Sequence, residues 1–135
     1  MANALYGLGR QGFLDANIDW SADNIKVVLV DAADYAVSID TDQFLSDVAA
    51  AGRVATSANL GTKTSTLGVA DAADVTLSSV TGDQSEALII YKDSGSSTTS
   101  NLIAYIDTAT GLPVTPNGGD ITITWDDGAN KIFKL

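Results

Sequence analysis

Most apolar residues of the chain fall into short runs that indicate β-strands. Residues 25–31 (IKVVLVD) are apolar almost throughout, which predicts a strand buried on both faces. Residues 35–39 (YAVSI) alternate between apolar and polar positions with a period of two, which is typical of a strand with one exposed face. The regular part of the chain is therefore expected to begin with strands.

The rest of the chain also predicts short strands, separated by clusters of Gly, Asp, Asn and Pro. These strands cover residues 53–57, 64–69, 75–80, 87–91, 102–107, 121–125 and 131–135. The last two are separated by about five residues that include Gly128, which predicts a hairpin between them. Residues 93–100 (DSGSSTTS) are expected to form the mobile tip of a second hairpin, between the strands at 87–91 and 102–107.

One well-marked α-helix is predicted near residues 41–51. Asp40 is a candidate N-cap with Gln43 three positions later, which is the arrangement of a capping box. Ile39 and Phe44 stand where a hydrophobic staple would be, and Gly52 stands where a C-cap glycine belongs.

The first 24 residues fit either a weak helix or an extended arm. Asn3 could cap a helix, but the three glycines that follow by position 12 would each cost about 1 kcal/mol relative to Ala. Large apolar side chains concentrate in this segment, and they could fold back on the protein's own core or dock on another subunit. The candidates for such an interface are Tyr6, Leu8, Phe13 and Trp20.

These patterns together predict an all-β fold, either a β-sandwich or a β-tulip-like domain, with one short α-helix near 41–51. The chain has 135 residues, which suits one domain, and no linker with a shift in composition divides it. We expect residues 1–24 to form an N-terminal arm or weak helix and residues 25–135 to form a single β-rich domain.

The charge of the chain supports the same interpretation. Acidic residues outnumber basic ones by 17 to 7, which gives a net charge of −10, and Glu86 is the one acid that is not Asp. Because the short side chain of Asp bonds to nearby backbone amides, Asp favours turns and caps. A negative exterior argues against binding to the phosphates of nucleic acid.

The chain has no His and no Cys, which excludes nucleophilic catalysis by the Ser-His-Asp or Cys-His route, disulfides and thiolate metal sites. The pairs Asp40/Asp42 and Asp126/Asp127 are the nearest approach to the two carboxylates of a hydrolase, but both occur in contexts of turns or caps. We predict that the protein is not an enzyme and has no cofactor. A bound calcium ion stays an open alternative, although the EF-hand pattern is absent.

No segment predicts contact with a membrane. The longest uninterrupted apolar run, residues 27–30, is far shorter than the roughly 18 residues needed to span a bilayer. The N-terminus lacks the basic and then apolar regions of a secretory signal. We therefore expect a soluble product.

The most distinctive stretch of the chain is residues 102–135 (LIAYIDTATGLPVTPNGGDITITWDDGANKIFKL). Together with residues 25–31, 42–57 (DQFLSDVAAAGRVATS) and 86–93 (EALIIYKD), it resembles a group of small proteins encoded among the structural genes of tailed bacteriophages. The resemblance spans most of the chain and implies a virion component. It brings no catalytic residues.

Virion proteins of this kind include capsid decoration (cement) proteins, head–tail connector proteins and tail proteins. A charge of −10 suits a decoration protein, because such a protein binds the outside of the shell, away from the packaged DNA. The resemblance thus implies a homo-oligomer that binds the major capsid protein lattice and stabilises the head. The protein would be made in the cytoplasm of the host bacterium and would lie on the capsid surface. Residues 1–24 would form an anchoring or swapping arm.

Two alternatives stay open. The first is a tail or connector protein. Tail-tube subunits usually stack through a long hairpin and loop, and residues 94–100 are the one short candidate for such a loop. The second is a carbohydrate-binding or adhesin β-domain, in which an exposed Trp20 or Trp125 would stack on sugar rings. Trp125 ends an alternating strand and is expected to lie in the core.

Overall fold

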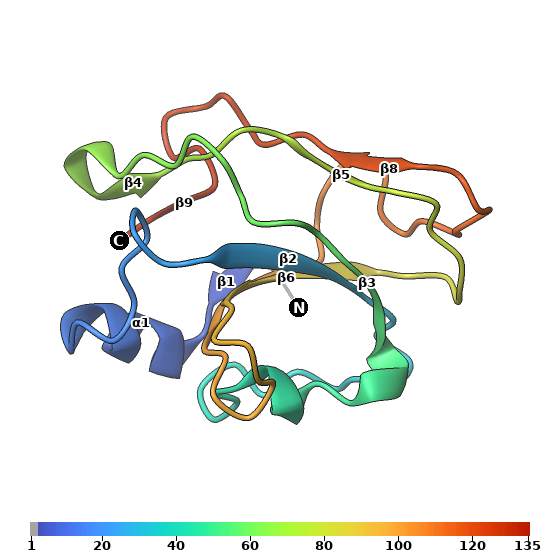
Figure 1. The fold of residues 1–135 in the computed structure, drawn as a ribbon, viewed down its shortest axis with the longest axis horizontal. Coiled ribbons are helices and arrows are strands. Elements are labelled where there is room, and N and C mark those ends of the chain that lie inside the picture. The colour runs from blue at the N-terminus through green and yellow to red at the C-terminus, as the bar shows by residue number, and fades with distance from the viewer. Residues whose placement is uncertain (1–2) are drawn as a thin grey trace.

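A five-stranded antiparallel sheet forms the centre of the protein in the computed structural model, which describes residues 3–135 (Figure 1). In spatial order its strands are β1 (Ala4–Leu5), β7 (Leu102–Ile106), β6 (Ala87–Lys92), β2 (Ile25–Val30) and β3 (Arg53–Thr56). The long apolar runs occupy the middle of the sheet, so the strands predicted at 25–31, 87–91 and 102–107 are confirmed, and so is the hairpin that joins β6 to β7.

Both faces of this sheet are covered, which explains why its central strands are apolar throughout. Successive side chains of a strand point to opposite faces, and along β2 the residues Val27 and Leu29 enter one core while Val28 and Val30 enter the other. All four are fully buried. The predicted all-β class with one short α-helix is confirmed.

Two small antiparallel ribbons cover one face of the sheet and form the upper layer in Figure 1. One ribbon pairs β4 (Val69–Ala70) with β9 (Phe133–Lys134), and the other pairs β5 (Val75–Leu77) with β8 (Ile121–Ile123). The short 3₁₀ helix η3 (Thr66–Gly68) precedes β4. The core below these ribbons includes Trp20, Leu60, Leu77, Ile123 and Trp125.

Irregular segments cover the opposite face and form the lower layer (Figure 1). They contain two 3₁₀ helices, η1 (Leu45–Asp47) and η2 (Ala50–Gly52). The loop between β6 and β7 lies against η1, because the N–H groups of Leu45 and Ser46 donate to the carbonyl oxygens of Ser100 and Ser97. The tip that was expected to be mobile is therefore hydrogen-bonded into the lower layer.

The α-helix predicted near 41–51 is wrong, since η1 and η2 are its only helical turns. Two aspartates hold the backbone in other conformations. The Asp42 carboxylate accepts from the N–H of Ser38, and the Asp47 carboxylate accepts from the N–H groups of Gln43 and Phe44. Such bonds compete with helical ones, so Asp40 has no helix to cap.

The helix of the described chain is instead α1 (Gly7–Leu14), inside the segment predicted as an arm or weak helix. Its N-cap is Tyr6 rather than Asn3. The Asn3 side chain accepts from the N–H groups of Asp107 and Thr108 beside the antiparallel pair of β1 and β7, and so fixes residue 3 to the sheet edge.

Two further strand predictions and one hairpin prediction are wrong. Residues 35–39 form no strand, and the run at 64–69 is mostly loop and 3₁₀ turn before β4 begins. The hairpin expected between the last two strands is also absent, because β8 pairs with β5 whereas β9 pairs with β4. The chain turns away after β8 because the Trp125 N–H donates to the carboxylate of Asp74, 51 residues earlier.

Candidate functional site

A cleft of about 350 Å³ opens at the end of the molecule where the C-terminal end of α1, η3 and the end of β9 meet, on the left of Figure 1. Aromatic rings of Phe13, Trp20 and Phe133 line it. The ring centroids of Phe13 and Phe133 lie 6.0 Å apart, and those of Trp20 and Phe133 lie 5.3 Å apart with the rings nearly perpendicular at 82°. Because such tilted and edge-to-face contacts favour a defined geometry, the cleft has a fixed apolar floor.

Three leucines are exposed in or next in sequence to residues that line this cleft. Leu135 lines it, Leu14 directly follows the lining residue Phe13, and Leu67 directly precedes the lining residue Gly68. Their exposed fractions are 87% for Leu14, 91% for Leu67 and 57% for Leu135, and they are the large apolar side chains exposed within residues 3–135. We call the cleft and these three leucines the end surface. Apolar side chains grouped on a surface mark contact sites more often than single ones do.

Leu67 is held in an unfavourable backbone conformation. Its φ of 54° and ψ of 36° lie in the left-handed region, which costs a non-glycine residue about 1 kcal/mol or more. The side chain gains nothing from burial, because it is almost wholly exposed. Leu67 is thus both strained and exposed, a combination that local folding does not explain.

The structure separates the four predicted interface residues. Phe13 is half-buried in the cleft, and Trp20, which is 5% exposed, lies beside it. Leu8 is half-buried on α1, and Tyr6 is fully buried in the core on the other face of the sheet. The side chains of Tyr6 and Trp20 therefore fold back on the protein's own core.

Sequence reasoning missed the leucines of the end surface and Phe133. Leu67 belonged to a predicted strand, and Leu135 and Phe133 belonged to a predicted hairpin. The one signal in the sequence that Leu67 lies in a turn rather than a strand was the glycine that follows it, because Gly is common in tight turns.

A buried chain of hydrogen bonds joins the N-terminal segment to the lower layer. The hydroxyl oxygens of Tyr6 and Tyr35 lie 2.9 Å apart, and the Tyr35 hydroxyl donates to the Asp42 carboxylate at 2.6 Å. Burial is the main cause that raises the pKa of both tyrosines above the ordinary value, and for Tyr35 the bond to Asp42 adds to the rise. Both hydroxyls therefore stay protonated and fasten the start of α1 in place.

Both tryptophans are buried, and both indole N–H groups have partners. Trp20 donates to the carbonyl oxygen of Asp71 at 3.3 Å, and Trp125 donates to that of Ala73 at 3.1 Å. Trp125 is 8% exposed, which confirms its predicted place in the core. Both side chains are therefore almost wholly removed from solvent.

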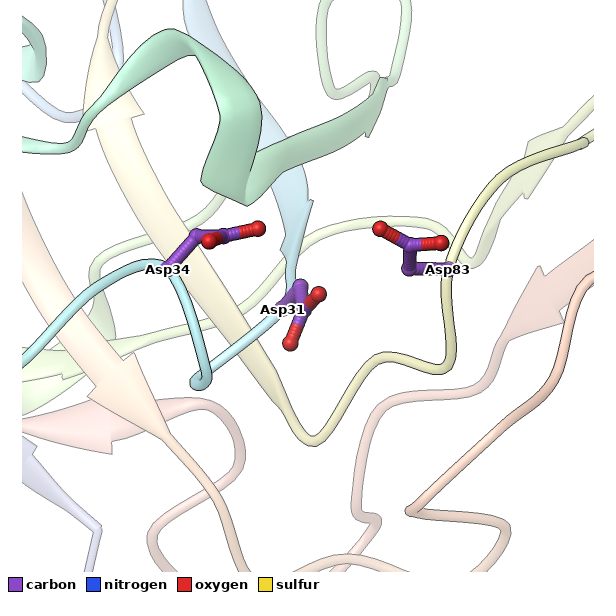
Figure 2. A group of neighbouring side chains, drawn as sticks. All are labelled: Asp31, Asp34 and Asp83. Carbon is purple, nitrogen blue, oxygen red and sulfur yellow. The ribbon is translucent and has the colours of Figure 1, made fainter.

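Three carboxylates lie close together at the C-terminal end of β2 (Figure 2). Asp31 and Asp34 belong to the turn that follows β2, and Asp83 comes from the loop between β5 and β6. One oxygen of each lies within 4.8 Å of the others. Asp31 is buried and already accepts from the N–H of Ala33, whereas Asp34 and Asp83 are exposed. These are the residues that could hold a cation, but three oxygens are fewer than the six to eight that Ca²⁺ takes.

The acidic pairs considered from the sequence lie elsewhere. Asp42 is engaged by Tyr35 and Ser38, and Asp126 and Asp127 are exposed, with Asp127 3.9 Å from the ammonium group of Lys131. The sequence could not have indicated the group around Asp83, because 49 residues separate Asp83 from Asp34.

No protein-family model matches this chain, and no curated protein matches it either. Within residues 3–135, none of the helices has both the length and the apolar character that crossing a lipid bilayer would require.

Proposed function

We propose that the protein is a structural component of a tailed-bacteriophage virion and that it decorates the capsid by binding the major capsid protein lattice. The observation that carries this proposal is the end surface, where the exposed Leu135 lines an aromatic cleft and the exposed Leu14 and Leu67 directly adjoin two other lining residues in sequence. The resemblance of residues 102–135 and three other stretches to virion proteins supplies the biological setting.

The exposed apolar side chains of the end surface suit the centre of a protein–protein interface. Stable protein interfaces bury about 800 Å² on each partner around a few central apolar residues. Leu14, Leu67 and Leu135 stand on three different elements, α1, η3 and the end of β9, so a partner that covers them would also clamp these elements together. Copies of the protein would then stabilise the shell by bridging neighbouring capsid subunits.

A decoration protein is favoured over a tail protein by the loop between β6 and β7. A stacking tail subunit would need this loop to extend, but residues 93–101 are hydrogen-bonded to η1 and to one another. The Ser100 hydroxyl donates to the carbonyl oxygen of Ser96 at 2.7 Å, and the Leu45 N–H donates to the carbonyl oxygen of Ser100 at 2.9 Å.

A carbohydrate-binding role is disfavoured by the tryptophans. Stacking on a sugar needs an exposed aromatic face, and Trp20 and Trp125 are buried with their indole N–H groups bonded to backbone oxygens. We therefore place the adhesin last among the alternatives.

The copy number in purified particles tests the proposal directly. Virions of the phage that encodes the chain would be separated on a quantitative gel with the major capsid protein as the standard. Hundreds of copies per particle are the expected result. A smaller number, of a few dozen copies or more, that equals the number of major tail subunits on the same gel would indicate a tail protein. A dozen copies or fewer would indicate a connector or tip protein. Absence from the particle would overturn the virion role.

A substitution at Leu67 tests the end surface. Asn tolerates the left-handed backbone, so Leu67→Asn removes the apolar side chain and relieves strain together. We expect the variant to be at least as stable as the wild type in urea and to lose most of its binding to undecorated shells in a sedimentation assay.

The matched control is Thr62→Asn. Thr62 is exposed, has a φ of 52° and does not line the cleft, so the change relieves the same kind of strain without removing an apolar side chain. It should leave binding to shells unchanged. Full binding by Leu67→Asn would remove the end surface from the proposal, even if the copy number places the protein on the capsid.

A further inference from the structure

A second, larger groove of about 900 Å³ lies between the main sheet and the upper layer, on the open side of β8. Its floor includes the buried Leu29 and Leu88 and the partly exposed Ile106. These residues face one another across the three central strands, since Leu29 pairs with Leu88 and Leu88 pairs with Ile106. The floor is thus one continuous apolar row, and the volume falls in the range of real binding sites.

One bank of the groove is the free edge of β8. The seven consecutive residues 120–126 all line it, whatever face their side chains occupy. This is expected where a groove runs along the edge of a strand, because side chains alternate between the two faces. The opposite bank is the turn of residues 108–112.

The edge of β8 has unused hydrogen-bonding groups. A strand in an antiparallel pair directs about half of its N–H and C=O groups away from its partner, and β8 pairs with β5 alone. Within residues 3–135, the backbone groups of residues 121–124 make no backbone bond beyond the pair with β5. An open edge of this kind is a template for another strand.

The charge around the groove is negative. The exposed residues Asp120 and Asp126 line it, and the one lining cation, Lys131, is 3.9 Å from the carboxylate of Asp127. A partner segment with basic residues would therefore match the groove better than an acidic one.

We propose that the groove binds an extended peptide segment of another protein, which adds as a new strand to the free edge of β8. Alternate side chains of this segment are apolar and point toward the partly exposed Ile106, above the buried Leu29 and Leu88. The intervening side chains face water, and the segment carries Lys or Arg near its ends, opposite Asp120 and Asp126. This site is separate from the end surface, and its existence does not depend on the capsid role.

A second copy of this chain is a poor occupant. Each copy carries a net charge of −10, which disfavours a second copy as the occupant of this acidic groove. The one stretch with two basic residues within five positions is 131–135 (KIFKL). It is already held by β4 and η3, because the N–H of Ile132 donates to the carbonyl oxygen of Ala70 and the N–H of Leu135 donates to that of Gly68.

The test uses the full chain and a synthetic heptapeptide in which Val and Thr alternate between terminal Lys residues. Seven residues in a strand span about 23 Å, which matches residues 120–126. We expect saturable binding by fluorescence anisotropy and slower amide hydrogen exchange within residues 121–124. A peptide with Pro at its centre cannot complete the strand pairing and should not bind.

Charge reversal of the groove supplies the specificity control. Asp126→Lys should weaken the binding of the Lys-flanked peptide about fivefold or more and strengthen the binding of an Asp-flanked version. Asp15→Lys makes the same change in charge at an exposed residue outside the groove and should leave both affinities nearly unchanged.

Three outcomes would overturn the proposal. One is no saturable binding of the Lys-flanked peptide, and another is binding that leaves the exchange of residues 121–124 unaltered. The third is self-association of the protein alone with protection of these amides, which would make a second copy the occupant. None of these results bears on the copy number in particles, so the capsid role is judged separately.

Discussion

The Tyr35 hydroxyl occupies the middle of the chain of hydrogen bonds that fastens the N-terminal segment, since it contacts both Tyr6 and Asp42. Tyr35→Phe would leave the fully buried Tyr6 hydroxyl without a partner, which costs about 1–3 kcal/mol. Tyr6→Phe removes only the terminal member and should cost about 1 kcal/mol. Urea unfolding at pH 7 measures both free energies. Equal losses would contradict the central place of the Tyr35 hydroxyl in this chain of bonds.

The same tyrosines make stability depend on alkaline pH. Burial raises the pKa of Tyr6 and Tyr35 in the folded state, whereas in the unfolded state each ionises near pH 10. Above about pH 10 the unfolded chain therefore loses protons that the folded chain keeps, and the free energy of unfolding falls as the pH rises. Tyr6→Phe should lose less stability than the wild type between pH 9 and 11. An identical pH profile would contradict this assignment.

The group of Asp31, Asp34 and Asp83 is expected to destabilise the fold slightly, because like charges lie within 4.8 Å. Asp83→Asn should raise the thermal midpoint by about 1 °C at low salt, and the gain should shrink in 0.15 M NaCl because salt screens exposed charges. Asp126→Asn, which changes an exposed acid outside the group, is the control. If CaCl₂ stabilised the wild type more than NaCl of equal ionic strength but not Asp83→Asn, the group would bind a cation.

At the scale of the elements, the sequence was informative where burial alone decides the structure. The strands β2, β6 and β7 are apolar on both faces, so their composition identifies them without knowledge of their partners. The short strands β4, β5, β8 and β9 have two or three residues each, and their pairing depends on contacts such as that of Trp125 with Asp74, which no local pattern reveals.

The same limit applies to the functional surfaces. Aromatic clustering in the first 24 residues drew attention to Phe13, which lines the cleft, but not to its contact with Phe133 from the other end of the chain. The helical pattern near 41–51 failed because Asp42 and Asp47 bond to local backbone N–H groups, and because the segment is hydrogen-bonded to the loop between β6 and β7.

The packing of α1 on β7 depends on a glycine. A Cβ atom at Gly9 would lie 2.5 Å from the carbonyl oxygen of Leu102 and 3.2 Å from the Cα of Ile103, which are backbone atoms that cannot turn aside. Gly9→Ala should therefore cost about 1–3 kcal/mol in the free energy of unfolding, although Ala favours helices. Gly61→Ala, with open space around the new Cβ, is the control and should change stability by less than about 1 kcal/mol. A neutral Gly9→Ala would mean that α1 can shift away from the sheet.

For the molecule as a whole, the N-terminal segment connects the layers. Tyr6 belongs to the core of the lower layer, whereas Ile18 and Trp20 belong to the core of the upper layer. The main sheet lies between these two cores, and β1 forms one edge of it. A detachable arm would leave both cores intact on removal, but this segment contributes buried side chains to each.

Deleting residues 2–20 should consequently unfold the protein rather than only release it from a partner. The loss of a large buried side chain costs about 2–5 kcal/mol, and the deletion removes three of them, Tyr6, Ile18 and Trp20, against a total stability of about 5–15 kcal/mol for a typical domain. We expect the truncated chain to show no cooperative transition in urea, and we expect a synthetic peptide of residues 1–21 to restore that transition when added in trans. A truncated chain that unfolds with the midpoint of the wild type would instead restore the detachable arm. In that case the end surface, which takes Phe13 and Leu14 from this segment, could no longer be tested apart from the arm.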